Sequence, residues 1–209
     1  MSFRLYLFDL DGTLIDSIAL ILASFHHTRE RHFGDRLPDA RYIAMLGTTL
    51  RDAFKHMADT PEAVEAMVAT YVSYNMKHHD GMVRAYPGVP EMLGELSRRG
   101  SRLGLVTSKL RDNAIQGLRV TGLEDFFEIV IGAEDVKRGK PDPEPVLLAL
   151  GRAGIAAADT VFVGDSPHDI ESGRRAGVKT AAATWGPFPR EALEAAGPDL
   201  WLEKPADLL

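Results

Sequence analysis

The sequence predicts an α/β protein: a doubly wound, mostly parallel sheet with an inserted helical unit. Five short runs are apolar on both faces, which is typical of strands buried on both sides of a parallel sheet. Helical patterns separate these runs, and strands that alternate with helices indicate βαβ units. One long segment, residues 16–82, carries helical patterns and no convincing strand.

The expected strands and helices alternate along the chain. The first strand is expected at 3–8 (FRLYLF), and the others at 102–107, 128–132, 160–164 and 178–183. Asp142 followed by Pro143 predicts a helix start and Gly154 its end, because an acidic cap and a proline in the first turn favour helix initiation. The pair Ser166-Pro167 repeats this start, and Gly177 is the expected stop.

Residues 16–82 form the expected helical unit, and residues 1–15 and 83–209 form the sheet domain. Apolar residues at 18, 21, 22 and 25 repeat at helical spacing, and Thr60-Pro61 opens a second helix with the same stripe. Shorter helices are expected at 41–46 and 50–57. Asp16 is expected to cap the first helix of the unit.

Composition excludes several classes of protein. The 209 residues are enough for one sizeable core, or for one core with a small second unit. The net charge is −6 without a basic stripe, which argues against a nucleic-acid binder. There is no cysteine for disulfides or thiolate metal sites, and the first apolar run is too short for a signal segment or a membrane span. We therefore expect a cytoplasmic protein with no nucleic-acid, membrane or obligate protein partner.

Acids, hydroxyls and one lysine stand where the expected strands end. In open α/β sheets, ligands bind beyond the carboxyl ends of the strands, so these groups are expected to share one edge. The set comprises two acids after the first strand, a hydroxyl pair after the second, two acids after the fourth and a lysine before a proline: Asp9, Asp11, Thr107, Ser108, Asp165, Asp169 and Lys140.

This combination of groups suits phosphoryl transfer. Clustered carboxylates are stable together only when a cation or proton offsets them, and Asp9 and Asp165 can bind a hard divalent ion such as Mg²⁺. The Thr107 hydroxyl can donate to phosphate oxygens, and Lys140 adds a positive charge. One carboxylate can act as the nucleophile and form an aspartyl-phosphate. Asp11 can protonate the leaving oxygen and later deprotonate the attacking water.

Four motifs resemble those of the haloacid dehalogenase (HAD) superfamily, in order and at workable spacing. They are DLDGT at 9–13, VTSK at 106–109, GKPDPEP at 139–145 and GDSPHD at 164–169. The resemblance covers the whole chain and implies a Rossmann-like core with a small helical cap between the first and second motifs. It also implies Mg²⁺ as the cofactor and a small phosphorylated substrate.

The resemblance implies a role for each motif residue. Asp9 is the expected nucleophile, and Asp11 the general acid/base, whose backbone carbonyl also faces the metal. Thr107 is expected to bind phosphate through its hydroxyl. Lys140 is expected to neutralise charge, and Asp165 to be a direct Mg²⁺ ligand.

Two acids carry further information. Asp169 is expected to act on the metal through water or to hold Lys140 in place. Asp11 favours phosphate hydrolysis, because the dehalogenases and phosphonatases of the superfamily lack an Asp at that position. Two alternatives stay open: a sugar-phosphate mutase, since mutases keep both acids, and a non-catalytic phosphate-binding scaffold.

The cap indicates the substrate. The overall layout resembles the phosphoglycolate phosphatase subgroup, whereas the stretches SFHHTRERHF, GTTLRDAF and YNMKHHD look most like bacterial HAD-type inorganic pyrophosphatases. Arg51, in the GTTLRD loop, can point at a second phosphate or a carboxylate. The backbone amide of Ser108 is a further expected substrate contact. We therefore expect pyrophosphate as the substrate first, and phosphoglycolate or another small phosphomonoester second.

The histidines and Trp185 are expected to have structural roles. His78 and His79 point about 100° apart on a helix, so they rarely bind one ion together. With Asp80 they predict a solvated cluster beside the hinge. His168 is expected to lie behind the site or at the surface, and Trp185 to pack against the core.

Overall fold

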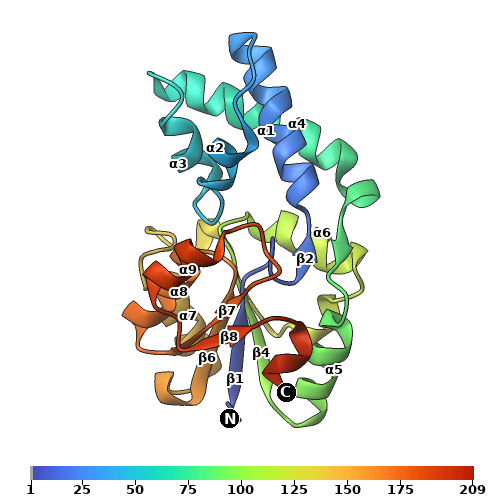
Figure 1. The fold of residues 1–209 in the computed structure, drawn as a ribbon, viewed down its shortest axis with the longest axis vertical. Coiled ribbons are helices and arrows are strands. Elements are labelled where there is room, and N and C mark those ends of the chain that lie inside the picture. The colour runs from blue at the N-terminus through green and yellow to red at the C-terminus, as the bar shows by residue number, and fades with distance from the viewer. Residues whose placement is uncertain (1) are drawn as a thin grey trace.

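The computed structural model describes residues 2–209 and contains a parallel sheet below a separate group of helices (Figure 1). The sheet has six strands in the order β5-β4-β1-β6-β7-β8, and every neighbouring pair is parallel. Their bounds are β1 Leu5–Phe8, β4 Arg102–Val106, β5 Ile129–Ile131, β6 Thr160–Gly164, β7 Lys179–Ala183 and β8 Leu200–Leu202. The prediction of a doubly wound parallel sheet is therefore confirmed.

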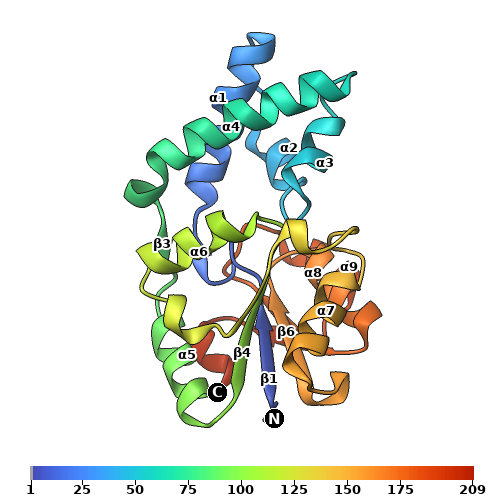
Figure 2. The same ribbon diagram turned by 180° about the vertical axis from the view of Figure 1, so that it is seen from behind.

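Helices cover both faces of this sheet, as Figure 2 shows from behind. The first face carries α5 Val89–Arg98 and α6 Arg111–Val120, and the second carries α7 Glu144–Ala153, α8 Pro167–Ala176 and α9 Arg190–Ala196. Among residues 2–209, short 3₁₀ helices lie in three of the connections, η1 Glu124–Phe126, η2 Ala133–Asp135 and η3 Ala157–Asp159, and another, η4 Pro205–Leu208, follows β8.

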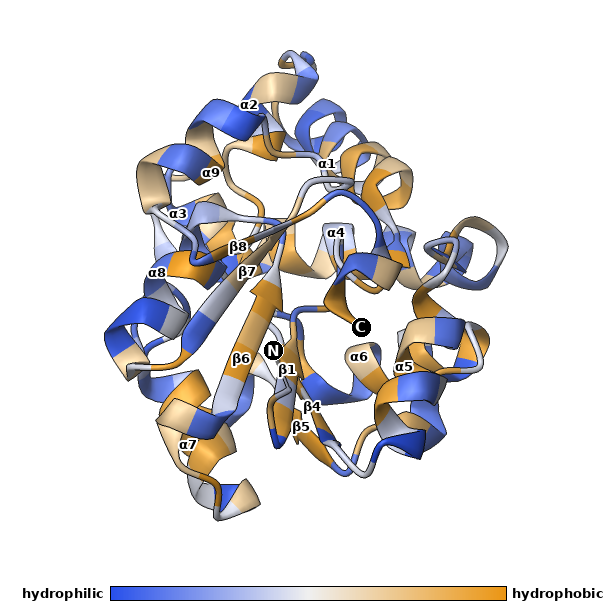
Figure 3. Ribbon diagram, turned by 60° about the horizontal axis from the view of Figure 1, so that its bottom comes forward, coloured by the Kyte–Doolittle hydropathy of each residue, from blue (hydrophilic) through white to orange (hydrophobic). Residues whose placement is uncertain are grey.

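Strand β1 is central and fully buried. Its side chains alternate between the two faces, because successive residues of a strand point to opposite sides. Tyr6 and Phe8 pack in the core under α5 and α6, whereas Leu5 and Leu7 pack in the core under α7. Figure 3 shows the central strands coloured as hydrophobic, with hydrophilic stretches on the helices around them.

The remaining helices form the unit above the sheet, at the carboxyl ends of the strands (Figures 1 and 2). They are α1 Ile18–Phe33, α2 Asp39–Ile43, α3 Leu50–Lys55 and α4 Pro61–Met82. This unit has a core of its own, in which the Phe25 ring lies 5.1 Å from that of Tyr42 and 5.0 Å from that of Tyr71. A two-stranded antiparallel ribbon, β2 Ile15–Asp16 with β3 Arg84–Ala85, connects the unit to the sheet.

Most of the helix ends that the sequence predicts are found in the structure. Ser166 and Asp169 form a capping box at the start of α8, and Gly177 ends that helix with a φ of 79°. Gly154 ends α7 in the left-handed conformation. Helix α7 begins one residue later than predicted, with Pro143 at the cap position.

One predicted cap is wrong. Asp16 does not cap α1, because its backbone is extended in β2 and its side chain is exposed. Ser17 occupies the cap position instead, and its hydroxyl makes no capping hydrogen bond. No helix among residues 2–209 has the length and apolar character needed to cross a membrane.

Candidate active site

Three neighbouring strands bring the predicted site residues to one edge of the sheet. Asp9 follows β1, Thr107 follows β4 and Asp165 follows β6, and β1 lies between the other two strands. Because the three strands are parallel, their carboxyl ends meet. All three side chains are buried: Asp9 is 5% exposed, Thr107 6% and Asp165 2%. The sheet topology thus places two carboxylates and a hydroxyl at a single buried position.

Lys140 is the buried cation of this group. Its side chain is 1% exposed, and its Nζ lies 2.9 Å from a carboxylate oxygen of Asp9 and 2.6 Å from one of Asp169. A buried ammonium is stable only when opposite charges and hydrogen bonds compensate its lost hydration. The two aspartates supply this compensation, so Lys140 is fixed at the end of β1.

Asp169 is held by the start of α8. One of its oxygens accepts from the backbone N–H of Ser166 at 3.0 Å and from the Ser166 hydroxyl at 2.6 Å, while the other faces Lys140. A Cβ added at Gly164 would lie 2.3 Å from the Cβ of Asp169, so only glycine leaves room for this side chain. Of the two arrangements that the sequence left open for Asp169, this geometry favours the one that holds Lys140.

Asp165 sits in a cradle of backbone. Its Oδ1 accepts from the Thr13 hydroxyl at 2.7 Å. A Cβ added at Gly12, whose φ is 90°, would lie 2.5 Å from the other carboxylate oxygen, and one at Gly186 would lie 2.3 Å from the Asp165 Cβ. The Trp185 indole N–H donates to the carbonyl oxygen of Thr13 at 3.0 Å and so ties the two sides of the cradle together.

The acids of the site form a candidate metal centre. Asp9, Asp165 and Asp169 each offer an oxygen, and these oxygens lie within 4.8 Å of one another. Burial raises the pKa of Asp9 to about 7, although Lys140 opposes this shift, and burial also raises the pKa of Asp165 well above its usual range. Three buried carboxylates against one ammonium leave excess negative charge. Oxygen donors with excess negative charge fit a hard divalent cation such as Mg²⁺.

Asp11 has a different environment from Asp9. Its Oδ1 accepts from the Lys109 ammonium at 2.8 Å and from the Ser17 hydroxyl at 2.6 Å. Burial by itself would raise the pKa of Asp11, but Lys109 and Ser17 outweigh it and bring this pKa below its ordinary value. The surroundings of Asp11 therefore favour its carboxylate form, whereas burial shifts Asp9 toward its protonated form.

A cavity of about 290 Å³ lies between these residues and the helical unit. Its lower wall is polar and includes Asp9, Asp11, Thr107, Ser108, Lys109 and Lys140. Its upper wall is largely apolar and includes Ile18, Ile21, Met45, Val68, Val72 and Met76. The loop before α3 closes one side, where the Ser108 hydroxyl donates to the carbonyl oxygen of Gly47 at 2.6 Å.

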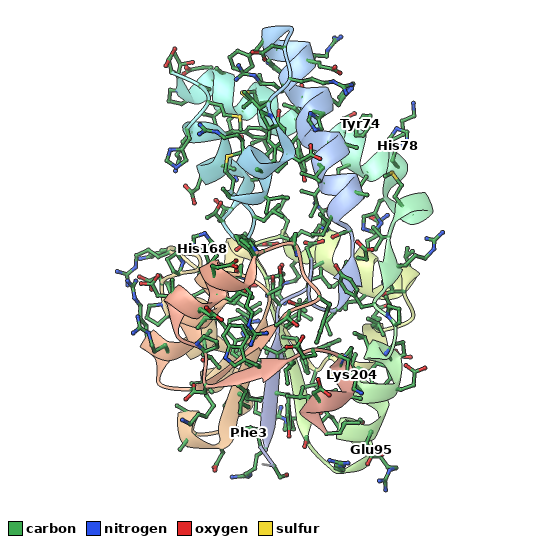
Figure 4. All side chains as sticks on the ribbon, viewed as in Figure 1. Phe3, Tyr74, His78, Glu95, His168 and Lys204 are labelled. Carbon is green, nitrogen blue, oxygen red and sulfur yellow. The ribbon has the colours of Figure 1, made fainter. Side chains whose placement is uncertain are left out.

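Arg51 also borders the cavity, but its charge is engaged elsewhere. Its guanidinium donates to both carboxylate oxygens of Glu65, at 2.6 and 3.1 Å, and its side chain is 59% exposed. His168 lies at the top of the sheet domain, facing the helical unit (Figure 4). The Cβ of an added side chain at Gly47 would approach the His168 ring within 3.1 Å, so this histidine supports the loop that closes the cavity.

The prediction of a solvated cluster at His78, His79 and Asp80 is wrong for His79. His79 is fully buried, and its Nε2 has no hydrogen-bond partner. It continues the buried stripe of α4 at four-residue spacing, after Tyr71 and Asn75. His78 lies on the outer side of α4, with its ring 4.5 Å from that of Tyr74 (Figure 4).

Sequence reasoning missed three residues that hold the acids: Thr13, Ser17 and Lys109. Thr13 and Lys109 lie inside two of the motifs identified in the sequence, so their place in these motifs could have marked them as site residues. Ser17 had no such signal, because its contact with Asp11 depends on the path of the chain into α1.

Comparison with known proteins identifies relatives over the whole chain. The family profile described as haloacid dehalogenase-like hydrolase matches residues 6–183. A pyrophosphatase PpaX of Bacillus pumilus is 43% identical over 203 residues, covering 97% of this chain and 93% of the relative. A pyrophosphatase PpaX of Halalkalibacterium halodurans is 40% identical over 209 residues, covering 100% and 96%. A haloacid dehalogenase-like hydrolase structure from Bacteroides fragilis has a TM-score of 0.93 at 28% identity, covering 100% of both chains.

Proposed function

The chain belongs to the haloacid dehalogenase-like hydrolase family, and from this we propose that it hydrolyses inorganic pyrophosphate through an aspartyl-phosphate on Asp9, with Mg²⁺ bound. The observation that carries the proposal is the buried Asp9, which Lys140 contacts at 2.9 Å, which clusters with Asp165, and which lines the same cavity as Asp11. The names of the two pyrophosphatase relatives support the choice of substrate.

In the first half-reaction, Asp9 attacks the phosphorus of one phosphate. The bond between that phosphorus and the bridging oxygen breaks, its electron pair stays on the bridging oxygen, and the second phosphate leaves as an anion. The phosphoryl group remains on Asp9. Lys140 and the Thr107 hydroxyl offset the negative charge on its oxygens, which is where charge stabilisation acts in phosphoryl transfer.

In the second half-reaction, water attacks the phosphoryl group and restores Asp9. Asp11 accepts the proton of that water, a role for which it must be a carboxylate. Its hydrogen bonds to Lys109 and Ser17 keep it in that form. A departing phosphate is a much weaker base than an alkoxide, so the first half-reaction of an anhydride makes little demand on a protonated acid.

Asp9 and Asp165 are the residues that we propose to hold Mg²⁺, together with the backbone carbonyl of Asp11. Bound there, the ion supplies positive charge beside the phosphoryl group being transferred. Asp169 keeps Lys140 in place through its 2.6 Å contact. Thr13 holds the Asp165 carboxylate in a fixed orientation.

A second candidate substrate is a small phosphomonoester. Much of the upper wall is apolar, and residues such as Ile18 and Met76 offer no donor to a second phosphate, although Tyr71 and Asn75 also line the cavity. An organic leaving group would instead bury apolar surface against this wall.

The test is phosphate release with Mg²⁺ from pyrophosphate, phosphoglycolate and a set of sugar phosphates. We expect kcat/KM for pyrophosphate to exceed the others by about 100-fold, a difference of about 2.7 kcal/mol. Asp9→Asn should abolish turnover of every substrate, since the amide is not a nucleophile. Unchanged turnover in Asp9→Asn would contradict the aspartyl-phosphate mechanism. A higher kcat/KM for a phosphomonoester than for pyrophosphate would favour the second candidate substrate.

A further inference from the structure

Lys109 is a second lysine of the site, and its ammonium lies in the cavity at the end of β4. Its side chain is 14% exposed, and the only carboxylate within salt-bridge distance of it among the described residues is that of Asp11, at 2.8 Å. Its backbone is fixed on both sides: its N–H donates to the Thr107 hydroxyl at 3.2 Å, and its carbonyl oxygen accepts from Ala133 at 2.9 Å. The loop therefore aims this side chain into the cavity instead of leaving it free at the surface.

The cations around the cavity differ in how many partners already accept their hydrogen bonds. The Lys140 ammonium is 1% exposed and faces Asp9, Asp169 and, at 3.5 Å, the carbonyl oxygen of Val106, so its three donors are all directed at the protein. Arg51 is bound by Glu65 through two hydrogen bonds at the outer rim. Lys109 faces a single partner.

Asp11 does not depend on Lys109 alone. The Ser17 hydroxyl donates to the same oxygen of Asp11 at 2.6 Å, so the carboxylate keeps a donor when Lys109 turns to another anion. An anion next to the scissile bond can therefore take Lys109 as a partner while Asp11 keeps the Ser17 donor.

We propose that Lys109 binds the leaving group, and that it selects substrates whose leaving group is itself an anion, such as the second phosphate of a diphosphate anhydride. This inference rests on the proposed function, and it adds the residue that sets the substrate class. When the bond to the bridging oxygen breaks, the electron pair stays on the departing phosphate, whose negative charge increases. The Lys109 ammonium binds the charge that the second phosphate already carries before the bond breaks, offsets its increase, and gives up no proton. A leaving group that is uncharged until the bond breaks offers Lys109 no such anion in the bound substrate.

The experiment compares two substrates in the same preparation of the full-length protein with Mg²⁺. The leaving part of pyrophosphate is a charged phosphate before the bond breaks, whereas that of para-nitrophenyl phosphate is uncharged until it departs as a phenolate. For Lys109→Met we expect kcat/KM for pyrophosphate to fall about 100-fold more than kcat/KM for the aryl phosphate, a difference of about 2.7 kcal/mol, while the weaker support of Asp11 lowers both values alike. The ratio of the two values does not depend on the fraction of protein that is folded.

Lys109→Arg keeps the charge, so it should recover at least about a tenth of the lost pyrophosphate activity. Lys55→Met is the matched control: Lys55 is 64% exposed and paired with Asp52 on α3, so both activities should stay unchanged. An equal fall of both activities in Lys109→Met would overturn the inference, because it would mean that Lys109 only positions Asp11.

Failure of the proposed function gives a different pattern. If the unmodified protein turns over phosphoglycolate and not pyrophosphate, the proposal that pyrophosphate is the substrate fails. The Lys109 inference can still be tested, because the leaving group of phosphoglycolate is glycolate, which carries a carboxylate. Lys109→Met should then lose phosphoglycolate turnover selectively over the aryl phosphate. If the ratio of kcat/KM for phosphoglycolate to kcat/KM for the aryl phosphate stays the same in Lys109→Met, the Lys109 inference is overturned as well.

Discussion

The two walls of the cavity are built in different ways. The wall at the sheet edge consists of buried charges that fix one another: Lys140 is 1% exposed and contacts two aspartates. The wall from the helical unit is largely apolar, and its one arginine, Arg51, is exposed and paired away from the centre. The buried pairs at the sheet edge therefore leave little room for substitution, and under the proposed function this wall carries the chemistry.

Among the substitutions that leave the nucleophile in place, the largest effect is expected from Lys140→Met. Removing one partner of a buried charge network leaves Asp9 and Asp169 uncompensated, which costs about 3 kcal/mol of unfolding free energy. Turnover should fall by more than about 1,000-fold, because the phosphoryl oxygens lose their nearest fixed cation. Urea unfolding and phosphate release measure the two effects. A variant with normal turnover would show that the sheet edge is less constrained than its geometry implies.

Gly186→Ala is the next test of the same wall. The added Cβ would lie 2.3 Å from the Cβ of Asp165, so the carboxylate must move out of its cradle. We expect turnover to fall by about 100-fold and the Mg²⁺ concentration for half-maximal activity to rise about tenfold, as for other disturbed ligand positions. Gly94→Ala is the control, because a Cβ there meets nothing within 4 Å and alanine suits a helix.

The titration of Asp9 predicts how Mg²⁺ stabilises the protein at different pH values. Because burial raises the pKa of Asp9 from 3.8 to about 7, the folded metal-free protein keeps a proton that the unfolded chain loses. The stability of the metal-free protein should therefore fall as the pH rises between these two values. Mg²⁺ replaces that proton, so its effect on Tm should be larger at about pH 8 than at about pH 5.5. Equal shifts at both pH values would contradict a site made of Asp9.

The same contrast between the walls explains what the sequence could predict. Asp9 and Asp165 follow apolar runs, and a parallel sheet brings strand ends together, so local pattern and topology sufficed. The partnership of Lys109 with Asp11 joins residues 98 positions apart and depends on how a loop turns after β4, which no local pattern encodes.

The wrong predictions have the same origin. Asp16 has the residue type of a cap, but the β2–β3 ribbon extends its backbone and Ser17 takes the position. His79 is polar, but its place on the α4 stripe buries it against the sheet domain near Gly117. In both cases tertiary packing overrides the local preference of the residue.

Ser108→Ala tests the contact between the walls. The Ser108 hydroxyl donates to the Gly47 carbonyl oxygen at 2.6 Å, and the loss of one such neutral hydrogen bond costs about 1 kcal/mol. We expect kcat/KM for the preferred substrate to fall about fivefold through KM, with kcat nearly unchanged, because the loop closes the cavity less firmly. A loss confined to kcat would place Ser108 in the chemistry of the sheet edge instead.

The smallest effect is expected from Arg51→Ala, which tests the helical wall. Arg51 and Glu65 form an exposed ion pair, and such pairs contribute under about 1 kcal/mol to stability. If the guanidinium stays with Glu65 during turnover, kcat/KM should change by less than about threefold, and Glu65→Gln should change it equally little. A loss above about 30-fold in Arg51→Ala but not in Glu65→Gln would mean that Arg51 leaves Glu65 to contact the substrate. The helical wall would then add a charge to the reaction, and the contrast between the two walls would not hold during turnover.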